Sequence, residues 1–241
     1  MAAEPSVPSS LQDISTDLDQ HAAFLRMLAG LYFKPLAQEQ IDAFDADAFH
    51  TLALASQDAL MSEGYNDIWR FLRRRDTGTR QVLNVDFTGA FYGASTYEGL
   101  CAEPYESLYT SAEGVLMGPA RDAAFHIYKD HGMKVQEGLD LPDDHLTFEL
   151  EFLAALCDRA CQALQAADVE AAKEEISLAR DFSHDHICNW FNRFFNLSNK
   201  LLTTRFYRGV NKIAKAFLLE EPEMFAAARG FIDAAARARG I

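Results

Sequence analysis

Apolar residues recur at steps of three and four along most of this chain, which is the spacing of one face of an α-helix. The clearest stripe comprises Leu146, Leu150, Leu153, Cys157, Ala160 and Leu164. Val and Ile, which favour strands, are few, whereas Ala and Leu are abundant. The pattern predicts an all-α protein, a single globular helical domain of roughly ten helices over residues 15–241.

Capping and breaking residues predict where the helices begin and end. Ser15 or Thr16 is the expected N-cap of the first helix, residues 1–14 are expected to be a flexible lead, and Lys34-Pro35 ends that helix. Further helices are predicted at residues 38–44, 47–62 (closed by Gly64), 66–75, 79–92, 119–131 (capped by Gly132), 143–166 (capped by Asp143 or Asp144), 169–195 (with a break near Ser183), 199–219 and 222–239. Residues 94–110 have no helical period and are predicted to form an ordered loop, which in a helical domain is usually functional or mobile.

Charge and cysteine usage narrow the class of protein. The net charge is −14, from 36 acidic and 22 basic residues, which disfavours nucleic acid as a partner and favours cationic segments. The four cysteines include no CxxC pair, so Cys157 and Cys161 are predicted to pack in the core rather than bind metal. With no signal-peptide pattern and no apolar window long enough to span a membrane, the sequence predicts a cytoplasmic protein.

Acidic and aromatic residues gather around the predicted loop. Residues 94–120 hold Glu98, Glu103, Glu106 and Glu113 and no Lys or Arg, and the aromatic residues at or near the loop include Phe91, Tyr92, Tyr105 and Tyr109. Asp143 and Asp144 add charge from a second segment, and Leu108, Leu116 and Met117 add apolar surface. Because carboxylates form bidentate pairs with guanidinium groups and aromatic rings stack on them, a site for a positively charged, partly apolar peptide is predicted. The alternative is that these are solvated surface charges, a plain helix cap and rim aromatics.

Two strings give the sequence a likeness to a known family. They are Glu103-Pro104-Tyr105-Glu106-Ser107-Leu108-Tyr109, followed by Glu113-Gly114-Val115-Leu116-Met117-Gly118, and Leu141-Pro142-Asp143-Asp144-His145 before a Leu/Phe-rich helix. Weaker likenesses lie at residues 31–35, 86–93 and 186–191. In order and spacing the strings resemble the TorD/DmsD/NarJ-type redox-enzyme maturation chaperones, most closely the TorD/DmsD branch.

The resemblance implies a non-catalytic, all-helical chaperone of anaerobic respiration. Such a protein binds the twin-arginine signal peptide, and often the body, of a molybdenum-containing oxidoreductase, and holds that enzyme in the cytoplasm until its cofactor is inserted. The implied peptide-binding residues are Phe91, Tyr92, Glu103, Tyr105, Glu106, Ser107, Tyr109, Gly118, Asp144 and His145. Tyr105 stands where some relatives carry tryptophan, which leaves the preferred partner open. A monomer or a domain-swapped homo-oligomer is compatible with the family.

Two other chemistries are alternatives to peptide binding. A helical metal-dependent enzyme would use His145, His184, His186 and nearby acids, although a lone histidine beside a helix cap more often completes a local hydrogen-bond network. Arg205, Arg208, Lys212 and Lys215 share one helix face and would bind phosphate or, more plainly, face solvent. Because no phosphate-binding glycine motif is present, no cofactor is expected and any nucleotide binding would be weak. For the chaperone, Asp144→Lys is predicted to weaken peptide binding without loss of helical structure.

Overall fold

The computed structural model describes residues 10–92, 100–136, 138–139 and 141–239. Across these residues the chain forms twelve α-helices and one π-helical segment, with no strand, which confirms the all-α prediction. The helices are α1 (Leu11–Phe33), α2 (Gln38–Ala43), α3 (Ala46–Ala55), α4 (Ala59–Leu72), α5 (Thr79–Phe91), α6 (Glu106–Thr110), α7 (Pro119–Asp130), α8 (Leu146–Gln165), α9 (Val169–Phe182), the π-helix η1 (Ser183–Cys188), α10 (Phe191–Leu201), α11 (Arg205–Leu218) and α12 (Glu221–Arg239).

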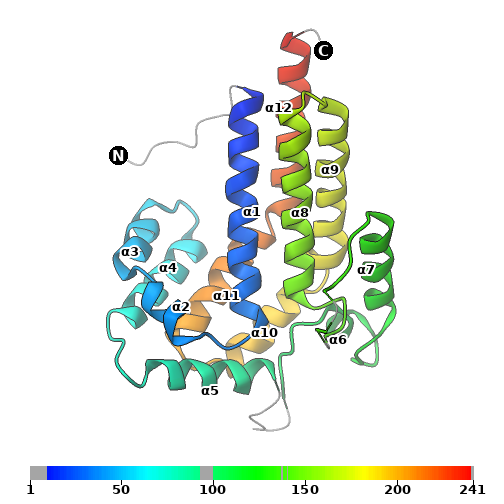
Figure 1. Cartoon of the computed structure of the whole chain (residues 1–241). Coiled ribbons are helices and arrows are strands. Elements are labelled where there is room, and N and C mark those ends of the chain that lie inside the picture. The colour runs from blue at the N-terminus through cyan, green and yellow to red at the C-terminus, as the bar shows by residue number, and fades with distance from the viewer. Residues whose placement is uncertain (1–9, 93–99, 137, 140, 240–241) are drawn as a thin grey trace.

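Four long helices form the central layer of the molecule. Figure 1 shows α1, α8, α9 and α12 running lengthwise beside one another, with α2–α4 on one side of them and α7 on the other. Helix α11 packs on α4, and α5 lies across the end of the bundle near α10. The short helix α6 lies close to the first turn of α8, at the edge of the bundle that α7 covers.

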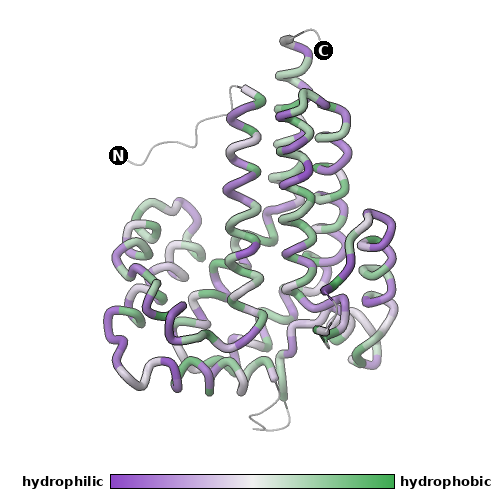
Figure 2. Tube along the Cα trace, in the orientation of Figure 1, coloured by the Kyte–Doolittle hydropathy of each residue, from purple (hydrophilic) through white to green (hydrophobic). Residues whose placement is uncertain are grey.

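The core is made by the apolar stripes that the sequence pattern predicted. Along the helices of Figure 2, hydrophilic and hydrophobic residues are interspersed, as expected for amphipathic helices in which each turn carries both a polar and an apolar face. The stripe of α8 is buried along its whole length, and Cys157 within it and the neighbouring Cys161 are buried free thiols. The prediction that these cysteines pack in the core is therefore confirmed.

The first helix begins earlier than predicted. Ser10 is the N-cap, with its hydroxyl accepting a hydrogen bond from the Asp13 amide at 3.2 Å, so neither Ser15 nor Thr16 has that role. Leu11 and Ile14 are buried against the core. Because these two side chains pack in the core, the helix includes residues 11–14, which were expected to belong to a flexible lead.

The prediction that one helix spans residues 47–62 and ends at Gly64 is wrong. Helix α3 ends at Ala55, Asp58 caps α4, and α4 runs through Gly64, so the helix predicted at 66–75 is its second half. A Cβ atom at Gly64 would lie 2.8 Å from the Gly209 carbonyl oxygen and 2.7 Å from Ile213 Cγ1. Gly64 therefore permits the close crossing of α4 over α11 and does not terminate a helix.

Three later boundaries also differ from the sequence prediction. The described part of the predicted loop contains helix α6, and His145 rather than Asp143 or Asp144 is the N-cap of α8. The predicted break near Ser183 is confirmed as the start of η1, but α11 begins at Arg205, after α10 has ended at Leu201. Glu98 lies outside the described residues. Within the described helices, none combines the length and apolarity needed to cross a bilayer.

Candidate functional site

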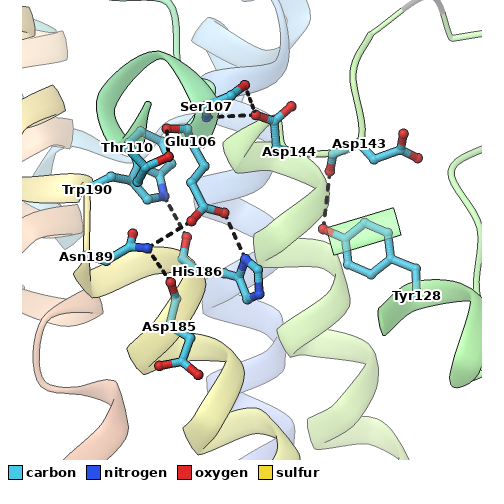
Figure 3. Close-up of polar contacts among 10 residues, drawn as sticks. All are labelled: Glu106, Ser107, Thr110, Tyr128, Asp143, Asp144, Asp185, His186, Asn189 and Trp190. Carbon is cyan, nitrogen blue, oxygen red and sulfur yellow. Dashed lines mark hydrogen bonds and ion pairs between the residues drawn. The ribbon is translucent and has the colours of Figure 1, made fainter. Parts of the chain in front are cut away.

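The two motif segments of the sequence lie side by side in the fold. Tyr105 and His145 form a single antiparallel bridge, in which the Glu106 amide donates to the Asp144 carbonyl oxygen at 3.0 Å and the Leu146 amide to the Pro104 carbonyl oxygen at 2.8 Å. The bridge aligns the start of α6 with the start of α8. The polar side chains that follow it are shown in Figure 3.

Asp144 holds the first turn of α6. Its Oδ2 atom accepts hydrogen bonds from the Ser107 amide, at 2.8 Å, and from the Ser107 hydroxyl. Both side chains are fully buried, and Asp144 Oδ1 has no partner. Burial raises the pKa of Asp144 while the bonds from Ser107 act against the rise. Asp144 is therefore an internal anchor, and a lysine at this position would be buried.

Glu106 ties α6 to the π-helix. Its carboxylate contacts His186 Nδ1 at 2.8 Å and accepts from Asn189 Nδ2 at 2.9 Å, as Figure 3 shows. Glu106 and His186 are both buried. The wider π-helical turn lies directly before Asn189. Such turns are frequently found at functional sites.

Glu149 is a third buried carboxyl group beside this network. It is fully buried on α8, and its carboxyl oxygens make no hydrogen bond of good geometry, although Trp190 and Glu106 are near enough to act on its charge. Burial, together with the nearby charges of Glu106 and Asp144, holds the pKa of Glu149 well above its ordinary value. Glu149 was not among the site residues predicted from the sequence. Its place on the apolar stripe, three residues after Leu146 and four before Leu153, was the pattern that could have revealed it.

His145 is neutral in this environment. Burial lowers the pKa of its imidazole to about 4. Its Nδ1 atom accepts from the Thr147 amide at 3.1 Å, and its ring contacts Tyr105 edge-on at 4.8 Å between centroids. Tyr105 is itself buried, which raises the pKa of its hydroxyl to about 12. The pair closes the corner between α6 and α8.

The other predicted aromatic residues divide between core and surface. Phe91 is buried and stacks on Phe194, so it belongs to the core. Tyr92 is 46% exposed and donates to the Phe33 carbonyl oxygen at 3.0 Å. Tyr109 is partly buried and stacks on Trp190 at 5.3 Å.

The exposed part of the candidate site lies mainly after α6. Glu103 is partly buried and Glu113 is exposed, while Gly118 is the N-cap of α7. The side chains of Val115, Leu116 and Met117 are also exposed, and Met117 has a left-handed backbone with φ of 62°. One acid, Glu113, and three apolar side chains thus share one surface segment, residues 111–118.

The three histidines proposed for a metal-dependent enzyme have different contacts in the structure. His145 caps α8, His186 binds Glu106, and His184 is exposed beside Asp185 at 2.7 Å. Among the described residues, no group of three or more His, Cys, Asp or Glu side chains is placed to hold a metal ion.

Two of the four basic residues of the stripe on α11 pair with acids of α4, and Arg208 donates to the Leu202 carbonyl oxygen at 2.8 Å. Arg205 contacts Asp67 at 2.7 Å, and Lys212 contacts Glu63 at 2.7 Å and Asp67 at 2.6 Å. Lys215 lies over the Phe195 ring, 4.3 Å from its centroid. These contacts link α11 to its neighbours.

A family of known proteins matches the part of the chain that carries this site. The family model described as nitrate reductase delta subunit matches residues 55–196, which is more than half of the chain and includes α6, the start of α8 and η1. The chain belongs to this family. The resemblance predicted from the two motif strings is therefore confirmed at the level of the family.

Several chaperones from vibrios are similar to this member of the family along nearly their whole length. The chaperone protein TorD of Vibrio cholerae serotype O1 is 27% identical over 88% of this chain and 94% of its own length. The chaperone protein TorD of Vibrio vulnificus is 27% identical over 87% of this chain and 96% of its own. The chaperone protein TorD of Vibrio parahaemolyticus is 23% identical over 86% of this chain and 95% of its own length. The similarity thus extends well beyond the matched segment.

Proposed function

We propose that this protein is a chaperone for the maturation of a molybdenum-containing oxidoreductase. It binds the twin-arginine signal peptide of that enzyme and keeps the enzyme in the cytoplasm until its own cofactor has been inserted. The observation that carries the proposal is the similarity, over nine-tenths or more of their length, to proteins named as chaperone TorD. In this proposal the chaperone binds no cofactor of its own and catalyses no reaction. It contacts the signal peptide and the body of the client enzyme.

The division between buried and exposed residues assigns different roles within the proposed site. Glu106, Ser107, Asp144 and His145 are internal, so in this proposal they fix α6 against α8 and η1. Tyr92, Glu103, Tyr109 and the acidic and apolar segment 111–118 form the outer surface that meets the peptide. The carboxylates of Glu103 and Glu113 pair with the guanidinium groups, and the exposed ring of Tyr92 stacks on them.

Calorimetric titration with synthetic leaders tests this function. A peptide with an arginine pair followed by an apolar stretch is expected to bind, and the same peptide with both arginines changed to alanine is expected to bind at least tenfold more weakly, a difference of about 1.4 kcal/mol. A double variant, Glu103→Lys with Glu113→Lys, is expected to lose most of that preference. Glu39→Lys, on α2, is the matched charge-reversal control. Equal heats with the two peptides would contradict the proposal.

A further inference from the structure

A groove of about 590 Å³ opens between the end of α1, the first turns of α8 and the segment that follows α7. Its volume is within the range of roughly 300–1,000 Å³ typical of ligand sites. Most of its wall is apolar. The apolar side chains that line it are Phe33, Met133, Val135, Leu139, Phe148 and Phe152.

A helical glycine forms part of the groove. Gly30 lies inside α1, is exposed, and lines the groove. A Cβ atom built there would have nothing within 4 Å, in contrast to Gly64, where the protein's own backbone requires glycine. Glycine lowers helix stability relative to alanine, so the fold itself gives no reason for Gly30. A bare helix backbone in an open apolar groove allows a second backbone to approach closely.

The groove is continuous with the corner where α6 meets α8. Thr147 lines it, donates its hydroxyl to the Ala29 carbonyl oxygen at 3.0 Å, and donates its amide to His145. The Phe148 ring lies 5.9 Å from the His145 ring. Tyr128, on the opposite wall, donates to the Asp143 carbonyl oxygen at 3.3 Å. Residues that contact the corner, and not the Tyr105–His145 pair itself, therefore line the near end of the groove.

The charges along the groove suit an apolar occupant. Its rim carries one acid, Glu151, and one base, Lys134, and Glu151 faces Arg26 at 3.7 Å. The carboxylates that would attract arginine lie instead in the loop around α6, at Glu103 and Glu113. An elongated ligand with a cationic end and an apolar body matches this separation of charge from apolar surface.

We propose that the groove between α1 and α8 binds the apolar stretch that follows the arginine pair of the signal peptide. The inference rests on the proposed function, which supplies that peptide. The backbone of the apolar stretch packs against Gly30, and its side chains contact Phe33, Phe148 and Val135. Met133 adapts the groove to leaders of differing sequence.

Filling the groove from Gly30 provides the test. Gly30→Leu extends an apolar side chain into the groove without meeting another atom of the wall at its Cβ. Gly230→Leu makes the same change at a glycine of α12 that also has open space and does not line the groove. Anisotropy titrations would use the full length of the chaperone and a labelled leader peptide, with circular dichroism to verify the fold. Val135→Asp, on the opposite wall, is a second variant.

The expected results separate this inference from the proposed function. Gly30→Leu and Val135→Asp each weaken the full leader by about tenfold or more, and Gly230→Leu leaves its affinity unchanged. If Gly30→Leu binds the leader as the unmodified protein does, the groove is not the site, while the chaperone function stands. If a leader without arginines binds as tightly and still loses affinity to Gly30→Leu, the groove stands and arginine recognition fails. If the unmodified protein binds no leader, both proposals fall.

Discussion

At the scale of single residues, the most unusual group is the carboxyl of Glu149. Burial holds its pKa well above the ordinary value, so it retains its proton in the folded state at pH values where the unfolded chain has released it. The folded state then binds more protons than the unfolded state. Stability conferred by this group is present at acidic pH and is lost as pH rises from about 4.3, the unfolded pKa, through the folded pKa.

Glu149→Gln is expected to remove this pH dependence. Within that pH window the unmodified protein should lose about 1.4 kcal/mol of unfolding free energy per pH unit relative to the variant, because glutamine does not titrate. Urea unfolding at several pH values from about 5 to about 8 measures the difference. Glu113→Gln, at an exposed position, should show no such trend. A pH-independent difference for Glu149→Gln would show that the carboxyl is ionised in the folded state.

The burial of Asp144 and Glu106 was not predicted from the sequence. Asp144 and Glu106 were expected to face a cationic ligand, since carboxylates are seldom buried without partners. Their partners come from elsewhere in the chain: Ser107 for Asp144, and His186 and Asn189 for Glu106. The residue types alone indicated that Asp144 and Glu106 are important in this region. That their carboxylates are buried follows from the packing of α6 against η1, which the sequence does not reveal.

At the scale of elements, the attachment of α6 depends on Asp144. Asp144→Ala removes both hydrogen bonds to Ser107 and is expected to cost about 2–3 kcal/mol of folding stability. Hydrogen exchange of the Ser107 amide should become faster. Asp143→Ala, which removes an ion pair with Arg121, should leave that amide protected. If the Ser107 amide stays equally protected in Asp144→Ala, Asp144 does not anchor α6. Because Asp144 is buried, Asp144→Lys is also expected to destabilise the fold, contrary to the expectation from the sequence.

The crossing of α4 over α11 gives a second expectation for the elements. Gly64→Ala and Gly209→Ala each place a Cβ atom less than 3.0 Å from atoms of the facing helix, and each is expected to lower stability by about 1–3 kcal/mol. Gly230→Ala, in open space on α12, should instead raise it by about 0.5–1 kcal/mol. Thermal unfolding distinguishes the two signs. A gain in stability at Gly64 would mean that the helices separate readily.

Helices were predictable where periodicity is long, as in α1 and α8, because the apolar stripe alone defines the buried face. Gly64 was mistaken for a helix terminus, since a glycine that permits close packing and one that ends a helix look alike until the facing helix is known. Helix α6 was missed because its five residues are too few to show a period. The π-helical turn at Ser183 was predicted only as a break, since its geometry depends on contacts with Glu106 and α8.

At the scale of the whole molecule, charge and shape act on different parts of the proposed ligand. The net charge of −14 surrounds the protein with a negative potential that attracts a cationic leader from a distance. The apolar groove acts only on contact. Recognition is therefore expected to have two stages, in which electrostatic attraction sets how fast the peptide arrives and apolar burial sets how long it stays.

Salt separates these stages. Raising ionic strength from about 0.01 M to about 0.15 M shortens the screening length from about 30 Å to about 8 Å. The association rate of a twin-arginine leader should then fall several-fold, whereas its dissociation rate changes little, which stopped-flow fluorescence measures directly. A leader with alanines in place of the arginines should show a much weaker salt effect on association. Gly30→Leu should accelerate dissociation at every salt concentration while leaving the salt dependence of association as it is. If salt acted mainly on dissociation instead, the charges would lie within the bound contact, and attraction at a distance would contribute little.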